Sequence, residues 1–204
     1  MTRRRTGYYG GTFDPVHRTH VAMARTAVSA LRLDALYFVP NALPPHKAAS
    51  RETTYEQRCE MIRLATASVS KLGISNIEAE PVIHYTADTV ERLRAAAPDE
   101  VIYFIIGEDS LRAIDSWHEP HRIFKQVRLA VFPRGRATSS DALAALCRRT
   151  SARYGGRIDM IPMSGTDISS SGIRAARRRG ASIDGMVVPA VKEYIERHGL
   201  YLKK

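Results

Sequence analysis

The stretch VIYFII, residues 101–106, decides the fold that this sequence predicts. Six consecutive apolar residues are typical of a central strand that is buried on both of its faces, as the strands of parallel sheets are. Gly107 follows at once and marks the start of a loop. A strand of this kind needs helices on both sides of its sheet, so the surrounding sequence must provide them.

Short apolar segments alternate with longer helical patterns along the chain. Further strands are expected at residues 36–40, 129–132 and 158–162, with a weaker first strand at 6–9. Helices are expected at residues 21–31, 55–70, 86–97, 139–153 and 170–179, with a last one through 188–195 that ends at Gly199. This alternation predicts an α/β fold: a Rossmann-like, doubly wound parallel sheet with helices on both faces. Ligands of such sheets bind beyond the C-terminal strand ends, where the strand order reverses.

The composition is that of one globular domain. The chain has 204 residues, of which 44% are hydrophobic and 25% charged. These fractions argue against disorder. There is no internal repeat and no Pro, Gly or Ser linker, so we expect a single domain over residues 1–204.

The charge and the cysteines limit the partners and the compartment. With 31 Lys and Arg against 21 Asp and Glu, the net charge of +10 favours anionic partners, either nucleic acid or small molecules with several phosphates. The basic residues are scattered, whereas nucleic-acid binders more often show a basic stripe with interleaved aromatics. No run of about 18 apolar residues exists to span a bilayer. The basic N-terminus lacks the apolar segment of a signal peptide, and Cys59 and Cys147 form no Cys-x-x-Cys. We therefore expect a cytoplasmic protein with neither a nucleic-acid nor a membrane partner.

The segment GGTFDPVHRTH, residues 10–20, joins the first expected strand to the first helix. Glycines after a strand let backbone N–H groups approach an anion, and a helix N-terminus adds free donors and partial positive charge. His17 and His20 are three residues apart and face the same way at a helix start. The segment is neither a P-loop nor the dinucleotide glycine fingerprint. A zinc site would need a third ligand that is not evident, and a glycine turn with two incidental histidines is the structural alternative.

Two further motifs suit phosphate groups. Ser169, Ser170 and Ser171 precede a helix, where serines are good N-caps. Arg174 lies one turn further on, where its guanidinium can reach a pyrophosphate held at the same helix start. Lys47 follows two prolines after the second strand, and a rigid surface loop explains that segment equally well.

The loop after residues 101–106 suits a nucleoside. Gly107 allows a close approach, and Asp109 can accept hydrogen bonds from ribose hydroxyls or act as a plain helix N-cap. Trp117 and His118 offer an aromatic platform, although a lone Trp is more often a core residue. The sequence contains no Gly-x-Ser-x-Gly or His-Glu-x-x-His motif and no segment typical of a catalytic cysteine. Their absence disfavours hydrolytic triads and zinc peptidases.

Together these motifs resemble the nicotinate-nucleotide adenylyltransferases, nucleotidyltransferases whose signature places glycines ahead of a His-x-Gly-His. The similarity runs in family order from about residue 10 to residue 201. It rests on residues 10–20, PPHK (44–47), HYT (84–86), IIGEDSL (105–111), Trp117 and ISSSGIR (168–174). The resemblance implies transfer of AMP from ATP to nicotinate mononucleotide in NAD biosynthesis, giving nicotinate adenine dinucleotide and pyrophosphate, with Mg²⁺ carried in with ATP.

The resemblance also implies roles for individual residues. The catalytic set would be His17, His20, Lys47 and Arg174. The ATP site would hold Gly10, Gly11, Thr12, Phe13, His17, His20, Gly107, Asp109, Ser170, Ser171 and Arg174. The nicotinate nucleotide would contact Lys47, Tyr85, Thr86, Trp117 and His118. Helices at about residues 170–199 would complete the phosphate site, no resident metal ligand is implied, and a homo-oligomer is left open.

Two positions depart from the family pattern. Thr19 stands where the motif has glycine, and a β-branched side chain there crowds the approach of the purine to the helix backbone. His118 stands where the family often has tyrosine. Two alternatives therefore stay open: the same transfer to another acceptor, such as nicotinamide mononucleotide or phosphopantetheine, and a non-catalytic nucleotide- or RNA-binding module.

Overall fold

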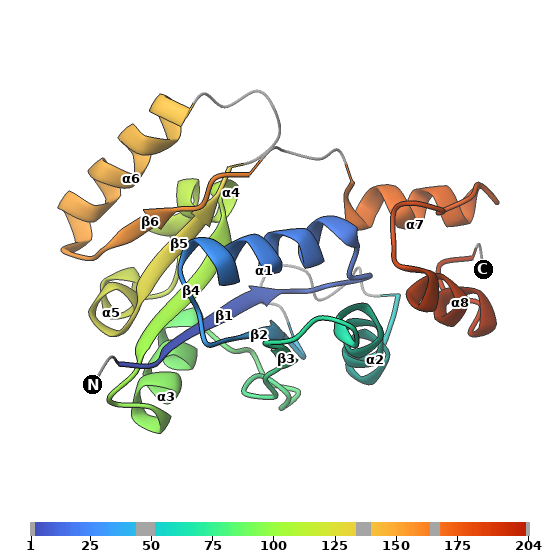
Figure 1. Cartoon of the computed structure of the whole chain (residues 1–204), viewed down its shortest axis with the longest axis horizontal. Coiled ribbons are helices and arrows are strands. Elements are labelled where there is room, and N and C mark those ends of the chain that lie inside the picture. The colour runs from blue at the N-terminus through green and yellow to red at the C-terminus, as the bar shows by residue number, and fades with distance from the viewer. Residues whose placement is uncertain (1–2, 44–51, 134–139, 164–167, 203–204) are drawn as a thin grey trace.

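The sheet contains six parallel strands in the part of the chain that the computed structural model describes, residues 3–43, 52–133, 140–163 and 168–202. The strand order is β3-β2-β1-β4-β5-β6 (Figure 1). The strands are β1 (Arg5–Gly11), β2 (Ala35–Pro40), β3 (Leu72–Ile74), β4 (Val101–Gly107), β5 (Arg128–Phe132) and β6 (Ile158–Met160). The chain winds outward in both directions from β1 and β4, which confirms the doubly wound topology predicted from the sequence.

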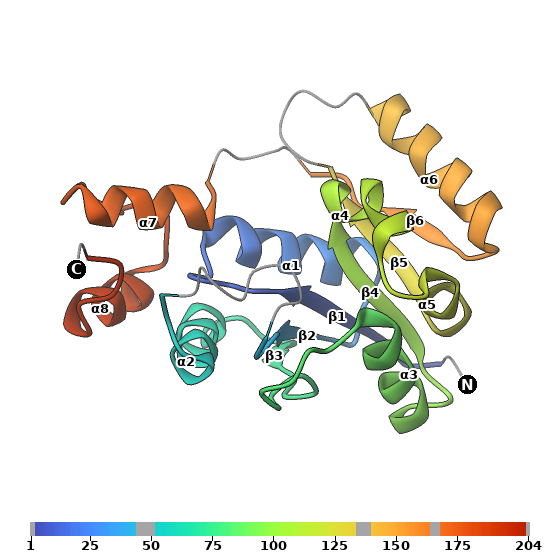
Figure 2. The same cartoon turned by 180° about the vertical axis from the view of Figure 1, so that it is seen from behind.

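Helices cover both faces of this sheet (Figures 1 and 2). They are α1 (Arg18–Ala30), α2 (Tyr55–Thr66), α3 (Thr86–Ala96), α4 (Glu108–Arg112), α5 (Pro120–Gln126), α6 (Ser140–Tyr154), α7 (Ser170–Arg178) and α8 (Pro189–Arg197), with a 3₁₀ turn at Ile114–Ser116. One hydrophobic core includes residues of α1, α2, α7 and α8, and a second includes residues of α3, α4, α5 and α6. None of the helices in these residue ranges is long and apolar enough to cross a membrane.

Strand β4 separates the two cores. Tyr103 and Ile105 belong to the first core, and Ile102, Phe104 and Ile106 belong to the second. None of the five is more than 4% exposed. Burial of side chains of this size contributes about 1.5–3 kcal/mol each, so β4 is buried on both faces as its sequence predicts.

The sequence did not reveal β3, α4 or α5. β3 is a half-buried edge strand of three residues, and the two helices have five and seven residues, too few to show a helical period. Strand β6 is shorter than expected because Pro162 has no N–H, and Ile161 N makes the last bond, to Val131 O. Helix α2 ends before residue 70, where the Val69 N–H bonds back three residues to Thr66 O.

Candidate active site

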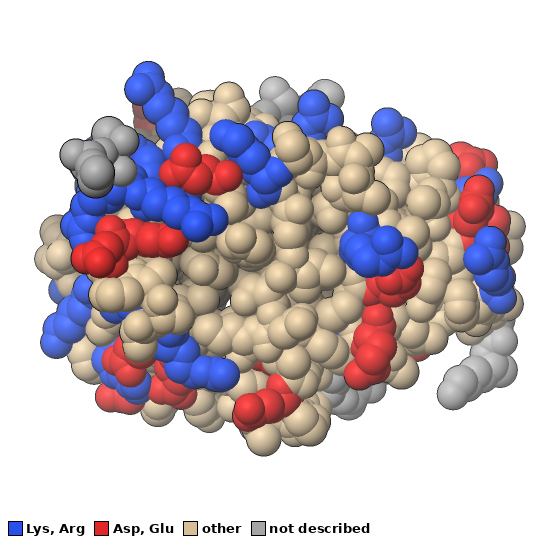
Figure 3. All heavy atoms as spheres, turned by 60° about the horizontal axis from the view of Figure 1, so that its bottom comes forward, with Lys and Arg blue, Asp and Glu red and all other residues tan. Residues whose placement is uncertain are grey.

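A cavity of about 530 Å³ lies where β1 and β4 end, at the reversal of strand order. This volume suits a small-molecule ligand. Seven of the residues predicted to bind nucleotides line it: Gly10, Gly11, Tyr85, Thr86, Gly107, Trp117 and His118. Figure 3 shows the molecule from the side of α3, and the middle of this face is hollowed and carries few charged side chains. The structure thus brings together residues of the segments 10–20 and 84–86 with Gly107, Trp117 and His118, which follow residues 101–106.

Close packing explains the two glycines at the end of β1. A Cβ atom at Gly10 would lie 2.9 Å from Cζ of Phe104, and one at Gly11 would lie 2.8 Å from Cζ of Phe13. A larger residue at either position would displace an aromatic ring. Asp109, by contrast, is exposed on α4, and its neighbour Ser110 lines the cavity. The predicted contact of Asp109 with a ribose stays a prediction.

His17 and His20 form a stacked pair at the start of α1. The ring centroids are 3.6 Å apart at an interplanar angle of 23°. The backbone N–H of His17 donates to Nδ1 of His20 over 3.3 Å, so the proton of a neutral His20 ring lies on Nε2. His17 is 6% exposed, and its Nδ1 is buried without a hydrogen-bond partner. The pair packs on Phe13 rather than lining the cavity, with the ring of His20 5.1 Å from that of Phe13.

Both histidines are neutral at physiological pH. Burial lowers the pKa of His17 to about 4. Burial also lowers the pKa of His20 well below its usual value, and the neighbouring His17 adds to that effect. The start of α1 therefore carries two uncharged imidazoles, while the backbone N–H of Arg18, its first residue, donates to Met186 O over 2.9 Å.

The loop between β1 and α1 is fixed through Asp14, a buried carboxylate that sequence reasoning missed. Its Oδ1 accepts hydrogen bonds of 2.6 Å from the hydroxyls of Thr53 and Tyr201. Its backbone oxygen accepts a bond of 2.7 Å from Nη1 of Arg174. A single loop residue thus joins the segment before α2, helix α7 and the C-terminal segment.

Arg58 is a second residue that contacts this loop and that the sequence did not predict. This fully buried side chain donates from Nη1 to Thr12 O over 2.9 Å and from Nη2 to Asn41 O over 2.8 Å. The two carbonyls belong to the segments that follow β1 and β2. Arg58 therefore fixes the separation of the two segments.

Arg174 contacts protein groups around the loop. Its Nε lies 3.2 Å from Oε1 of Glu52, and Glu52 also pairs with Arg178. The predicted contact of Arg174 with phosphate is compatible with these bonds, because a guanidinium has five N–H donors. Lys47 lies outside the described residues.

The serines at the start of α7 divide their roles. Ser169 is the N-cap, and its Oγ accepts from the Gly172 N–H over 3.1 Å. The hydroxyl of Ser170 donates to Pro15 O over 2.9 Å, so it ties α7 to the loop before α1. Ser171 Oγ lies 3.2 Å from Ser169 Oγ. The helix starts of α1 and α7 are thereby held next to each other.

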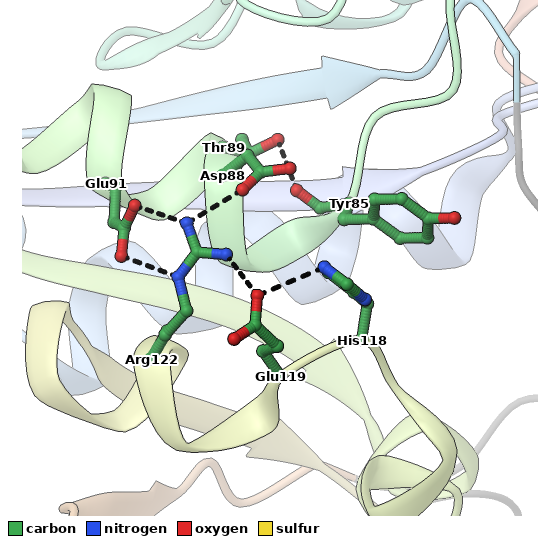
Figure 4. Close-up of polar contacts among 7 residues, drawn as sticks. All are labelled: Tyr85, Asp88, Thr89, Glu91, His118, Glu119 and Arg122. Atoms are coloured by element: carbon green, nitrogen blue, oxygen red, sulfur yellow. Dashed lines mark hydrogen bonds and ion pairs between the residues drawn. The ribbon is translucent and has the colours of Figure 1, made fainter.

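The aromatic side of the cavity, formed by Tyr85, Trp117 and His118, is adjacent to a group of ion pairs between α3 and α5 (Figure 4). The rings of Tyr85 and His118 are 4.3 Å apart, and Nε2 of His118 lies 3.2 Å from Oε2 of Glu119. Arg122 bonds to Glu119 over 2.7 Å and also to two acidic residues of α3, Asp88 and Glu91. These contacts set where His118 stands relative to the start of α3.

Glu78 is the one Asp, Glu, Lys or Arg among those cavity-lining residues that the structure describes. It is 8% exposed, and its Oε1 accepts from the Thr89 hydroxyl over 2.7 Å. Burial raises the pKa of this carboxyl, and the Thr89 hydrogen bond partly opposes the rise. No local motif pointed to Glu78, because it lies outside every strand and helix.

Comparison with known proteins agrees with this arrangement. Residues 8–176 match the model of the cytidylyltransferase-like family. A probable nicotinate-nucleotide adenylyltransferase of Geobacter sulfurreducens is 37% identical, and the alignment covers 97% of this chain and 98% of the relative. This chain belongs to the nicotinate-nucleotide adenylyltransferase family.

Solved structures share its fold. A Plasmodium falciparum nicotinic acid mononucleotide adenylyltransferase complexed with NaAD superposes with a TM-score of 0.81 at 19% identity, over 98% of each chain. The same Plasmodium enzyme complexed with APC gives a TM-score of 0.77 at 20% identity, again over 98% of each chain. The predicted family and fold class are confirmed.

The buried histidine predicts a pH-dependent stability. The pKa of His17 falls from 6.5 in the unfolded chain to about 4 in the folded protein. Between these pH values the unfolded state binds more protons, so the free energy of unfolding falls as the pH falls. Between pH 6.5 and 4, the free energy of unfolding measured in urea should fall by up to about 3 kcal/mol more for the wild type than for a His17→Gln variant. The control variant His121→Gln, at an exposed position of α5, should show the same pH dependence as the wild type. An equal change of the free energy of unfolding with pH in the wild type and in His17→Gln would contradict this explanation.

Removing one donor from Asp14 should loosen the loop before α1. We expect Tyr201→Phe to lower the free energy of unfolding by about 1–3 kcal/mol, because the buried carboxylate loses one of its two hydroxyl partners. The control variant Tyr194→Phe in α8 removes a hydroxyl that does not bond to Asp14, from a ring that packs on His198. It should lower the free energy of unfolding by less. Denaturant unfolding measures both variants, and the same loss in each would rule out a special role for the Asp14 bond.

Proposed function

We propose that this chain transfers AMP from ATP to nicotinate mononucleotide, giving nicotinate adenine dinucleotide and pyrophosphate. The observation that carries the proposal is the stacked, neutral His17–His20 pair at the start of α1, on the loop that follows the cavity-lining Gly10 and Gly11. In the proposal, residues 1–204 act as one domain, and α7 and α8 complete the phosphate site. A cytoplasmic location and the oligomeric state stay predictions.

The proposed phosphate site uses neutral donors. Nε2 of His20 and the ring of His17 would donate to oxygens of the triphosphate, where negative charge grows as pyrophosphate leaves. Ser171 and Arg174 would approach from the start of α7, with Lys47 assisting. The acceptor phosphate is already a nucleophile, so these groups need only align it with the leaving group and stabilise the developing charge.

The proposed acceptor site is the aromatic side of the cavity. Trp117 and the neighbouring rings of Tyr85 and His118, which are tilted by 33° to each other, would hold the pyridine ring. Thr86 is the first residue of α3, so the N–H groups of this helix start are free of intrahelical partners. Such donors suit the carboxylate that distinguishes the nicotinate nucleotide from its amide.

Mg²⁺ would arrive with the nucleotide. The described residues contain no group of three or more His, Cys, Asp or Glu that could hold a metal. This donor set fits an ion that is held chiefly by the triphosphate, as Mg²⁺ commonly is. When bound, the ion would neutralise part of the phosphate charge.

The function is tested by pyrophosphate release from ATP with nicotinate mononucleotide, with its amide, with phosphopantetheine and with no acceptor. We expect release to require an acceptor and to be fastest with the nicotinate nucleotide, and the product to be the dinucleotide by mass. His20→Asn should lower kcat by about 10²-fold, because it removes a preorganised donor at the phosphate. Faster release with another acceptor would reassign the substrate, and no release with any of them would support a binding module.

Thr19 should weaken ATP binding. It lies half-buried in the first turn of α1, where the family motif has glycine. A Thr19→Gly variant should therefore show a several-fold lower KM for ATP, at an unchanged KM for the acceptor, although the glycine costs the helix about 1 kcal/mol of stability. Thr26→Gly, further along α1, controls for that helix cost. Equal ATP KM values for wild type and Thr19→Gly would refute the crowding argument.

A further inference from the structure

Two cavities lie at the opposite end of the sheet, where the strands begin. One of about 620 Å³ is lined by Arg3, Arg4, Arg5, Arg32 and Asp34, which stand at the starts of β1 and β2. The other, of about 400 Å³, lies at the starts of β4, β5 and β6. Its charged lining residues are Arg3, Arg94, Lys125, Arg128, Arg157 and Glu100. Because Arg3 lines both, we treat them as one feature, the arginine groove.

The arginine groove accounts for most of the excess charge of the chain. Arg3 is shared, so eight different cations face two carboxylates across the two linings, an excess of six. The whole chain carries a net charge of +10. Like charges gathered in this way repel one another, so a groove with this lining is stabilised by an anion that enters it.

At the centre of the groove, two guanidiniums converge on a neutral group. Nη2 of Arg5 lies 2.5 Å from the hydroxyl oxygen of Tyr103, and Nη1 of Arg128 lies 3.3 Å from the same oxygen. Both guanidiniums also stand over the Tyr103 ring, at 5.3 and 5.8 Å from its centroid. Tyr103 is 1% exposed. A phenol holds two arginines together without cancelling either charge.

Two other cations of the groove have carboxylate partners, because Nε of Arg4 lies 3.6 Å from Oε1 of Glu100 and Nε of Arg157 lies 3.3 Å from Oδ1 of Asp159. Arg94 donates to backbone carbonyl oxygens, including Glu100 O at 2.8 Å and Gln126 O at 2.7 Å. The two carboxylates already have partners, because Asp34 accepts from the Arg5 N–H over 2.8 Å and Glu100 accepts from the Thr6 hydroxyl. Nε of Arg5 is buried and has no hydrogen-bond partner. The groove therefore holds an unused donor among cations that outnumber the lining carboxylates.

We propose that the arginine groove is a second anion site, which binds a small molecule carrying several phosphates. Guanidiniums match phosphate oxygens in pairs, and cavities of this size suit a small ligand. The aromatic residues of the two linings and their centre, Tyr103 and Phe124, are buried, so no exposed ring is available for stacking the bases of a single-stranded nucleic acid. Strands of five to seven residues separate this groove from the nucleotide cavity by about 20 Å.

The proposal is tested by calorimetric titration of the folded full-length protein with inorganic tripolyphosphate, without Mg²⁺ and at low salt. We expect two classes of binding site. Arg5→Gln and Arg128→Gln should each weaken tripolyphosphate binding to one and the same class, the arginine groove, by about tenfold. Arg128→Lys keeps the charge but loses the paired donors, so it should show a smaller loss even where the glutamine variants fold poorly. Arg197→Gln, at the end of α8, removes one charge at a distant site and should leave both classes unchanged.

The nucleotide site is separated from the groove by His20→Asn, which should weaken the other class and leave the arginine groove intact. Loss of all tripolyphosphate binding in His20→Asn would overturn the proposal, as would unchanged binding in both glutamine variants. Tighter binding of a 16-base-pair RNA duplex than of tripolyphosphate, lost in the same two variants, would replace the small anion by a nucleic acid.

Discussion

The buried carboxylate of Asp14 is the constraint on which the candidate active site depends. A carboxylate taken out of water costs several kcal/mol unless hydrogen bonds replace its hydration. Two hydroxyl groups do so here, and one of them comes from Tyr201, 187 positions further along the chain. The loop that carries the histidine pair is therefore placed only when the C-terminal segment has packed. Arg174 adds a bond from α7 to the backbone of the same residue.

The histidine pair shows why the site relies on neutral donors. At the 3.6 Å separation of the two rings, two positive charges would repel by about 5 kcal/mol at an effective dielectric constant of 20. Burial adds a penalty for charging either ring. The pair can therefore take up at most one proton at moderate pH. Fixed, uncharged donors of this kind stabilise charge as it develops without having to reorient.

Features that depend on neighbouring residues could be predicted, and features that depend on distant ones could not. The residues of β4, the glycines at the end of β1 and the helix starts at His17 and Ser170 follow from local pattern, so the fold and half of the described cavity lining were predicted. Arg58, Glu78 and Tyr201 act through partners 11 to 187 positions away. Nothing in the sequence near Arg58 distinguishes it from a solvated arginine. The burial of Asp14, which decides its role, exists only in the folded chain.

The two ends of the strands act as separate electrostatic regions. At the C-terminal ends, the described residues that line the candidate active-site cavity include one carboxylate and no Lys or Arg. At the N-terminal ends, eight cations line the arginine groove. The Debye length at physiological ionic strength is about 8 Å, well under the length of the strands, so these cations contribute little to phosphate binding at the other end. The net charge of the chain therefore says little about its candidate active site, where the proposed attraction for an anionic substrate comes from imidazoles and a few placed guanidiniums.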